Sequence, residues 1–382
     1  MTSFTLSQHP ALTLAPGASS NIGEHVVAVT GPKSRVLLVC DPAMIELGLA
    51  GPVLDNLNQH AHTVEVFSDL QSDPREHSVD AAVLQARSMD AQCVVGLGGG
   101  SALDTAKLVA NLTQTGEACA RFRLAAQALP FRKTGLIAVP TTAGTGSETT
   151  GVSIVSDPGG TKNWFFAPSL KPDLAVLDPQ LTVGLPAWWT FYTGMDALVH
   201  CIESRTNRYR FDENDVFSER GIVECTKFLE RAVQDPGSLE ARSGMMIAAA
   251  NGGLAISNTG CALAHNIGHA LGSLAHIPHG RAVSVALVQT LDWVIEGNRD
   301  AFDRVGELMG CRNAEGLCDK LNEMAEVCGE RLSLTEKEKS GLSSKALAQD
   351  MVSKANIAML ESTARTASDS DVEALAEQIL AT

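Results

Sequence analysis

Short hydrophobic runs rich in β-branched residues recur through the first half of the chain and alternate with segments of helical character. The runs cover residues 35–40, 64–67, 92–97, 136–139, 152–155 and 174–177. Strands separated by enough chain for a helix are typical of parallel sheets, because parallel neighbours need a crossover connection. The pattern therefore predicts a mostly parallel sheet flanked by helices.

The pattern changes after Leu185 and Pro186. Ala, Leu and Glu then recur at helical spacing, as in residues 372–380, and β-branched runs nearly vanish. We expect two domains, an α/β domain over residues 1–185 and an all-helical domain over residues 186–382. No repeat, low-complexity tract or long linker separates them in the sequence, so we expect them to pack tightly with a cleft between them.

Composition excludes several classes of protein. The chain has 382 residues, more than one compact domain usually holds, and 45% of them are hydrophobic against 19% charged. Such a chain is too apolar to be disordered. Lys and Arg number 29 against 44 Asp and Glu, which gives a net charge of −15. This charge repels phosphate backbones and anionic lipids, so neither nucleic acid nor a membrane is an expected partner.

Cysteine usage and the N-terminal sequence predict a cytoplasmic protein. The nine cysteines include no C-x-x-C pair, which favours free thiols in a reducing compartment. Residues 1–20 lack the basic and apolar regions of an export signal. Residues 244–280 hold no charged side chain other than histidine, yet their three asparagines and four histidines would be costly in a bilayer. We expect packed helices of a soluble domain there.

A glycine-rich turn is the first candidate for binding chemistry. In residues 94–107 a strand runs into Gly98, Gly99 and Gly100, and a helix follows. Ser101 is the expected N-cap of that helix, with Asp104 completing a capping box. Without bulky side chains, the first backbone N–H groups can approach a pyrophosphate, whose charge the helix dipole favours. A plain tight turn is the alternative.

A second loop strengthens the case for a nucleotide site. Residues 140–148 also follow a strand and offer four hydroxyl groups and two glycines. Ligands of open α/β sheets lie at strand ends, so two such loops favour a nucleotide more than one does. Asp41 closes an earlier strand, where its carboxylate would bind ribose hydroxyls and repel a 2′-phosphate, which favours NAD over NADP. Alternatively, Asp41 and Pro42 only begin a turn.

Histidines in the helical half suggest a metal centre. Asp196 and His200 are four residues apart, as are His265 and His269, so each pair shares a helix face. His279 follows in a Pro-His-Gly turn. One histidine on an apolar helix is usually a satisfied core residue, but several histidines with a carboxylate, in segments otherwise free of charge, favour a divalent cation.

The type of ligand leaves the identity and role of the cation open. One carboxylate and three imidazoles suit Fe(II), Zn(II), Mn(II) or Co(II). The candidates outnumber four ligand positions, so one histidine is expected to act outside the ligand set, and His276 is expected to be a bystander. A purely structural metal is the alternative.

Together these motifs resemble a known family. They are Gly98-Gly-Gly-Ser-x-x-Asp-x-x-Lys107, Pro140-Thr-Thr-x-Gly-Thr-Gly-Ser-Glu148, Gly194-Met-Asp-x-Leu-x-His200, and His265-x-x-x-His269 with Pro278-His279-Gly280. In this order they resemble the iron-containing (group III) alcohol dehydrogenases. The resemblance implies a dehydroquinate synthase-like architecture, in which an α/β nucleotide-binding domain precedes a helical domain and NAD(P) faces a metal across the cleft.

The resemblance also implies site residues. The metal ligands would be Asp196, His200, His265 and His279, with His269 beside the substrate as a proton-relay or orienting group. Gly98, Gly99, Gly100 and Ser101 would hold the pyrophosphate. The rest of the cofactor site would include Asp41, Asp104, Thr141, Thr142, Thr145, Lys162 and Leu181. Asp73, where relatives often carry Asn, is a departure on the adenosine side.

The activity implied is hydride transfer between NAD(H) and a small primary alcohol or aldehyde, with Fe(II), Zn(II) or another divalent ion, in a homodimer. Gly151 and Val152 replace larger residues of many relatives and suggest a roomier pocket. Four arginines, Arg205, Arg208, Arg210 and Arg281, either solvate a surface or attract an anionic, carboxylated or phosphonylated, aldehyde. A dehydroquinate synthase-like lyase and a non-catalytic nucleotide-binding protein are the remaining alternatives.

Overall fold

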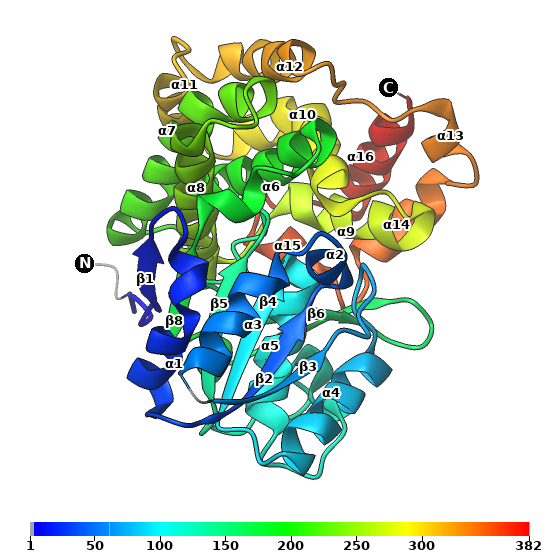
Figure 1. Cartoon of the computed structure of the whole chain (residues 1–382). Coiled ribbons are helices and arrows are strands. Elements are labelled where there is room, and N and C mark those ends of the chain that lie inside the picture. The colour runs from blue at the N-terminus through cyan, green and yellow to red at the C-terminus, as the bar shows by residue number, and fades with distance from the viewer. Residues whose placement is uncertain (1–3, 61, 382) are drawn as a thin grey trace. The chain divides into compact units, whose positions relative to one another are not determined.

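The computed structural model describes residues 4–60 and 62–381 (Figure 1). Contacts between Cα atoms divide this chain into two compact units. The α/β unit comprises Ser7–Thr142 and Gly146–Gly184. The helical unit comprises the described residues up to Leu6, the short segment Ala143–Thr145, and the chain from Leu185 onward.

The α/β unit is built on a six-stranded parallel sheet, as the sequence predicts. Its strand order is β1-β8-β5-β4-β2-β3, and every neighbouring pair is parallel. The strands are β1 (Ala11–Leu14), β2 (Arg35–Cys40), β3 (Thr63–Phe67), β4 (Cys93–Gly98), β5 (Gly135–Pro140) and β8 (Leu174–Leu177).

Two details of this sheet differ from the prediction. The edge strand β1 has no counterpart in the predicted set. Residues 152–155 belong to β6 (Val152–Ser156), which lies outside the main sheet and pairs in antiparallel fashion with β7 (Lys162–Phe166). The turn between β6 and β7 is too short for a helical crossover, so the two strands form a hairpin.

Helices cover both faces of the sheet, and alternate strand residues feed two separate cores. On one face Leu38 and Ile137 pack with side chains of α1 (Ile22–Thr30) and α3 (Ala50–Gln59). On the other face Leu37 and Leu136 pack with α4 (Glu76–Ser88) and α5 (Gly100–Leu112). Burial on both faces explains why the central strands read as continuous hydrophobic runs.

The helical unit carries no strand among its described residues, as expected for the second half. It begins with α6 (Ala187–Thr206), α7 (Asp212–Gln234), α8 (Leu239–Thr259), α9 (Leu263–Ala275) and α10 (His279–Gly297). The helices that follow are α11 (Arg299–Leu308), α12 (Leu317–Val327), α13 (Glu336–Lys339), α14 (Ser344–Met351), α15 (Ile357–Ser362) and α16 (Asp369–Ala381).

The long stretch without Asp, Glu, Lys or Arg, 244–280, runs from α8 through α9 to the first two residues of α10. Gly260, with φ of 78°, ends α8 in a backbone conformation that residues other than glycine rarely adopt. Among the described helices none combines the length and hydropathy needed to cross a bilayer. The expectation of packed helices at 244–280 is confirmed.

Candidate active site

Four of the predicted side chains converge in the helical unit. Asp196 and His200 lie on α6, His265 lies on α9, and His279 begins α10. Their ligand atoms all lie within 4.8 Å of one another. Asp196 Oδ1 is 3.9 Å from His200 Nε2, 3.5 Å from His265 Nε2 and 3.4 Å from His279 Nε2. The fold thus joins two helix faces and a turn that are far apart in the sequence.

This cluster fits a divalent cation. Asp196 and His265 are each 2% exposed, and in the described chain neither Asp196 Oδ1 nor His265 Nε2 has a hydrogen-bond partner. Buried polar atoms are normally satisfied, so two that face each other need an occupant. One carboxylate oxygen and three imidazole nitrogens form a donor set that suits a divalent transition metal or zinc. The His279 side chain is 31% exposed, so one side of the cluster is accessible.

Electrostatics within the cluster favour a cation as well. Burial alone would raise the pKa of Asp196, but the imidazoles of His200 and His279 outweigh burial and hold this pKa well below its usual value. Burial would lower the pKa of His200, whereas the Asp196 carboxylate raises it, with a net rise. The carboxylate therefore stays ionised, and protons and a metal ion compete for the same nitrogens.

His269 and His276 lie outside the ligand set. The ring centroid of His269 is 6.4 Å from that of His265 and 5.3 Å from that of His279. His269 is therefore beside the cluster, one helical turn further along α9. His276 caps the C-terminus of α9 in the left-handed conformation and is exposed.

The turn that carries His279 is seated directly on α6. A Cβ atom at Gly280 would lie 2.2 Å from the backbone oxygen of Tyr192, so only glycine fits there. Arg281, 8% exposed, donates to the Tyr192 hydroxyl at 2.6 Å and to both oxygens of Glu338. Tyr192 precedes Asp196 by one helical turn, so these contacts hold the metal-cluster segments of α6 and α10 together.

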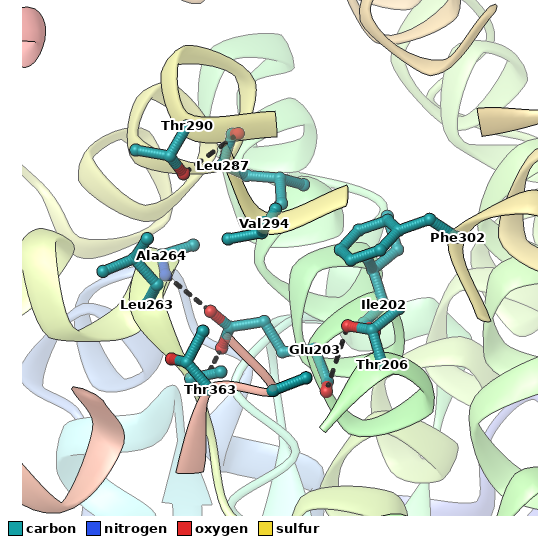
Figure 2. A pocket seen from close by; sticks show the side chains of 12 residues that line it. Ile202, Glu203, Thr206, Leu263, Ala264, Leu287, Thr290, Val294, Phe302 and Thr363 are labelled. Carbon is teal, nitrogen blue, oxygen red and sulfur yellow. Dashed lines mark hydrogen bonds between the residues drawn. The ribbon is translucent and has the colours of Figure 1, made fainter. Parts of the chain in front are cut away.

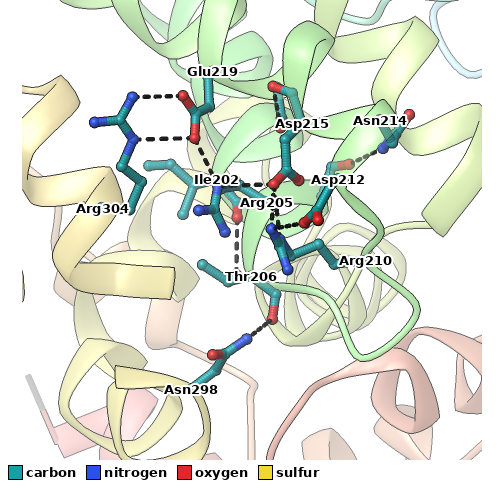
Figure 3. Close-up of polar contacts among 12 residues, drawn as sticks. Ile202, Arg205, Thr206, Arg210, Asp212, Asn214, Asp215, Glu219, Asn298 and Arg304 are labelled. Atoms are coloured by element: carbon teal, nitrogen blue, oxygen red, sulfur yellow. Dashed lines mark hydrogen bonds and ion pairs between the residues drawn. The ribbon is translucent and has the colours of Figure 1, made fainter. Parts of the chain in front are cut away.

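The arginines suspected of attracting an anionic substrate are engaged by the protein. Arg281 is bound as described above. Arg205 donates to Glu219 at 3.1 Å, and Arg210 donates to Asp212 and Asp215 (Figure 3). The fourth, Arg208, donates to Thr366 and to the backbone oxygen of Ala364.

These contacts divide the four arginines. Arg205 and Arg281 are buried and do not solvate a surface, whereas Arg208 is exposed, as the surface interpretation expects. Arg205, Arg210 and Arg281 are paired with carboxylates, which neutralise the charge that an anionic aldehyde would need.

One residue in contact with the metal cluster was missed by the sequence analysis. Glu203, at the end of the face of α6 that carries Asp196 and His200, accepts a hydrogen bond from His265 Nδ1 at 2.6 Å. Its spacing of three residues from His200 placed it near that face. The partner, however, is 62 residues away in the sequence, so only the fold reveals the contact.

The glycine turn of the α/β unit has the predicted form, with one correction. Gly98 ends β4 with φ of 152°, and a Cβ there would lie 2.7 Å from Asp41 Cβ. Gly99, not Ser101, is the N-cap of α5, and no side chain caps this helix. Ser101 lies inside the first turn, because the glycines allow the helix to begin earlier. The first backbone N–H groups of α5 are thus left without a side-chain cap.

The neighbouring strand ends bring further predicted residues to this turn. Thr141 donates its backbone N–H to Gly98 O at 3.0 Å, and Thr142 lies beside Gly99. Asp41 donates its N–H to Leu97 O, and its carboxylate caps α2 (Pro42–Glu46) through Ala43 N at 3.0 Å. Asp41 therefore begins the first turn of α2, and it lies next to the glycines.

The other predicted cofactor residues are more dispersed. Both oxygens of Asp104 are occupied: Oδ1 accepts from Ser147 and Lys107, and Oδ2 accepts from Ile154 N. Lys162, on β7, pairs with Asp73 at 2.7 Å. Leu181 lies in the core of the α/β unit, whereas Thr145 belongs to the helical unit.

Comparison with known proteins agrees with this arrangement. The family model for iron-containing alcohol dehydrogenases matches residues 10–179, and the model for the C-terminal part of the same family matches residues 190–380. The chain belongs to the iron-containing alcohol dehydrogenase family, and its predicted class, an oxidoreductase, is confirmed.

Individual relatives share this class. The chain is 32% identical to the probable alcohol dehydrogenase EutG of Escherichia coli, over 85% of this chain and 82% of EutG. It is 30% identical to the NAD-dependent methanol dehydrogenase of Bacillus methanolicus, over 83% of this chain and 82% of that protein. A crystal structure of sulfoacetaldehyde reductase from Bifidobacterium kashiwanohense in complex with NAD+ shares the fold, with a TM-score of 0.89, 24% identity and full coverage of both chains.

Proposed function

We propose that this enzyme interconverts a small primary alcohol and its aldehyde, with NAD(H) as redox cofactor and a divalent metal, iron(II) foremost, as Lewis acid. The observation that supports the proposal most strongly is the buried cluster of Asp196, His200, His265 and His279, with ligand atoms within 4.8 Å of one another. The NAD dependence is supported by the glycine turn and by the activity named for the methanol dehydrogenase relative. The nucleotide site is proposed for residues 1–185 and the metal site for residues 186–382.

In the proposed mechanism Asp196, His200, His265 and His279 hold the cation. When bound, the cation would polarise the substrate oxygen, and the nicotinamide would accept or donate the hydride. The burial of Asp196 and His265 keeps water away from the inner side of the cluster. His269 would take or return the hydroxyl proton at an imidazole nitrogen, a role supported by its ring lying 5.3 Å from that of His279.

In the α/β unit, the glycine turn Gly98, Gly99, Gly100 and Ser101 would bind the pyrophosphate through backbone N–H groups. The Asp41 carboxylate beside the turn would accept hydrogen bonds from ribose hydroxyls. Thr141, Thr142, Thr145, Lys162 and Leu181 complete the proposed site. Asp104 would act indirectly, since one of its oxygens holds Ser147 of the second loop and the other holds Ile154 of β6.

The decisive experiment is a panel of short alcohols and aldehydes assayed with NAD(H) and NADP(H) on metal-reconstituted protein. We expect turnover with NAD(H), loss of activity on chelation, and recovery with Fe(II) or a similar ion. Activity that survives complete removal of metal would defeat the metal-dependent mechanism. Stoichiometric NADH release on adding alcohol separates a dehydrogenase from a lyase that recycles its cofactor.

The anionic-aldehyde alternative is not favoured by the structure, because its arginines are engaged by the protein. It makes a distinct prediction in the same panel. An anionic aldehyde preferred by more than about tenfold in kcat/KM over its neutral analogue would restore this alternative, through residues other than the four arginines.

Two further properties are proposed with the function. A homodimer is supported by family analogy and by the edge strand β1, where Leu12 and Leu14 are 43% and 39% exposed. A cytoplasmic location is supported by nine cysteines that are free thiols. Light scattering coupled to size-exclusion chromatography tests the first, and cell fractionation tests the second.

A further inference from the structure

The carboxylate of Glu203 lies between α6 and the beginning of α9. The residue is 4% exposed and borders a small cavity of about 20 Å³ (Figure 2). Four hydrogen bonds reach its two oxygens, and all four donors belong to residues 262–265. The buried carboxylate of Glu203 is therefore bound specifically by the segment 262–265.

Each oxygen of Glu203 accepts two of these bonds. Oε1 accepts from the backbone N–H groups of Ala264, at 2.6 Å, and His265, at 3.3 Å. Oε2 accepts from the Ala262 N–H at 2.7 Å and from the His265 ring at 2.6 Å. The three threonines that line the cavity do not compete, because Thr206, Thr290 and Thr363 donate to backbone oxygens of α6, α10 and α15.

The backbone contacts cap a helix from outside. The N-cap residue of α9 is Ala262, whose side chain cannot accept a hydrogen bond. The first N–H groups of a helix lack partners within the helix, and negative charge at that end is stabilised by the dipole. Glu203 supplies hydrogen-bond acceptors for these N–H groups and a negative charge at this end of the helix. In this way α6 fixes the position of the first turn of α9, which carries His265.

The ring contact fixes the tautomer of His265. An ionised carboxylate only accepts hydrogen bonds, so His265 Nδ1 must carry a proton toward Glu203. The lone pair available for a metal is then on Nε2, the atom that lies 3.5 Å from Asp196 Oδ1 and has no hydrogen-bond partner in the described chain. Carboxylates in this position orient the ring and increase its basicity toward a metal.

We propose that Glu203 is a positioning residue of the metal centre, which holds His265 in the Nδ1-protonated form with Nε2 directed at the cation while capping α9. The proposal rests on the proposed metal site. A third group, Cys261, lies within 4.8 Å of Glu203 and His265. These three residues do not form a second metal site, because the oxygens of Glu203 are already filled by four donors.

Glu203→Gln is the sharpest test, because it changes one oxygen to an NH2 group at almost constant volume. The glutamine amide has one acceptor oxygen and one NH2 group. In either orientation of the amide, the NH2 group would face two of the N–H donors that bond to Glu203 in the wild type. Glu224→Gln is the matched control: Glu224 is a buried glutamate of α7, 6% exposed, that pairs with Arg220 away from the cluster. Both variants remove one buried carboxylate from the helical unit.

The measurements are the affinity for Co(II), the absorption spectrum of the bound Co(II), and the melting temperature of metal-free protein. For Glu203→Gln we expect affinity about 10- to 100-fold weaker and an altered Co(II) spectrum. The control should keep the wild-type affinity and spectrum. A lower melting temperature of metal-free Glu203→Gln would confirm the capping contribution.

The outcomes separate the two proposals. Wild-type affinity and an unchanged Co(II) spectrum in Glu203→Gln would overturn the positioning role, while leaving the dehydrogenase proposal intact. Weakened affinity with an unchanged spectrum would also count against it, because a purely structural effect alters occupancy and not the ligand geometry. If the wild-type protein itself takes up no divalent ion, the proposed function fails and the role of Glu203 fails with it.

Discussion

Arg281 donates to both carboxylate oxygens of Glu338, with distances of 2.6 and 2.8 Å, and so ties the first turn of α10 to the short helix α13. The same guanidinium group donates to the Tyr192 hydroxyl and to the Arg331 backbone oxygen. Because His279 lies two residues before Arg281, this network fixes the segment that delivers one member of the metal cluster. Its strength can be measured separately from catalysis.

Glu338→Gln should lower the stability of the protein in a pH-dependent manner. The hydrogen bonds from Arg281 lower the pKa of Glu338 to about 2, from a usual value of 4.5. A carboxyl group with a lowered pKa stabilises the fold above its unfolded pKa and loses this contribution as the pH falls through its folded pKa. We expect the free energy of unfolding to fall by about 2 kcal/mol at neutral pH. This difference from the wild type should decrease as the pH falls from about 4.5 to about 2.

Denaturant unfolding of both proteins across this pH range measures the effect. Glu336→Gln is the control, since Glu336 lies on the same short helix, is 91% exposed and pairs with Lys339. Equal stability of wild type and Glu338→Gln at pH 7 would show that the network contributes nothing to the fold.

Asp196→Asn should abolish metal binding and with it the activity. The substitution removes the only negative charge among the four ligand candidates, while keeping the size of the side chain. We expect loss of bound metal and a fall in kcat/KM of more than about 100-fold. This is a larger effect than substitution of a residue that only hydrogen-bonds to a metal ligand usually causes. Metal analysis and steady-state kinetics measure both. His276→Asn is the control, because His276 is exposed at φ of 54°, a conformation asparagine tolerates.

The sequence predicted the parts of the fold that depend on local patterns. Strands such as β4 are buried on both faces and therefore appear as uninterrupted hydrophobic runs. The edge strand β1 was missed because it is short and three of its four residues are exposed. Residues 152–155 were assigned to the main sheet because a hairpin strand has the same hydrophobic pattern as a sheet strand.

The site, like the fold, could be predicted from the sequence only where local patterns specify it. Spacing of four residues placed Asp196 with His200, and His265 with His269, on shared helix faces, so the cluster could be anticipated. Contacts between distant segments could not. The bond of Glu203 to His265 and that of Arg281 to Glu338 arise only when the helices pack, because nothing in the local sequence specifies the partner.

Gly98→Ala should impair cofactor binding and leave the metal centre unchanged. Gly98 has φ of 152°, and an added Cβ would lie 2.7 Å from Asp41 Cβ and 2.8 Å from Ala102 Cβ. The glycine turn must shift to make room, so we expect KM for NADH to rise about tenfold or more, with metal content unaffected.

Gly51→Ala provides the matched control for this substitution. Gly51 lies in α3 of the same unit, and a Cβ there meets no atom within 4 Å. Wild-type KM in Gly98→Ala, with circular dichroism confirming that the protein is folded, would exclude the turn as the pyrophosphate site.

Asp41→Ser should relax the preference for NAD over NADP. The carboxylate of Asp41 caps α2 through the Ala43 N–H at 3.0 Å, and serine is an equally good N-cap. The substitution therefore keeps the capping hydrogen bond and removes only the negative charge, which would repel a 2′-phosphate on the adenosine ribose. We expect the ratio of kcat/KM for NADPH to that for NADH to rise at least about tenfold, with little change in melting temperature. A ratio unchanged from wild type, at unchanged stability, would mean that Asp41 serves only as the cap of α2 and that another group selects the cofactor.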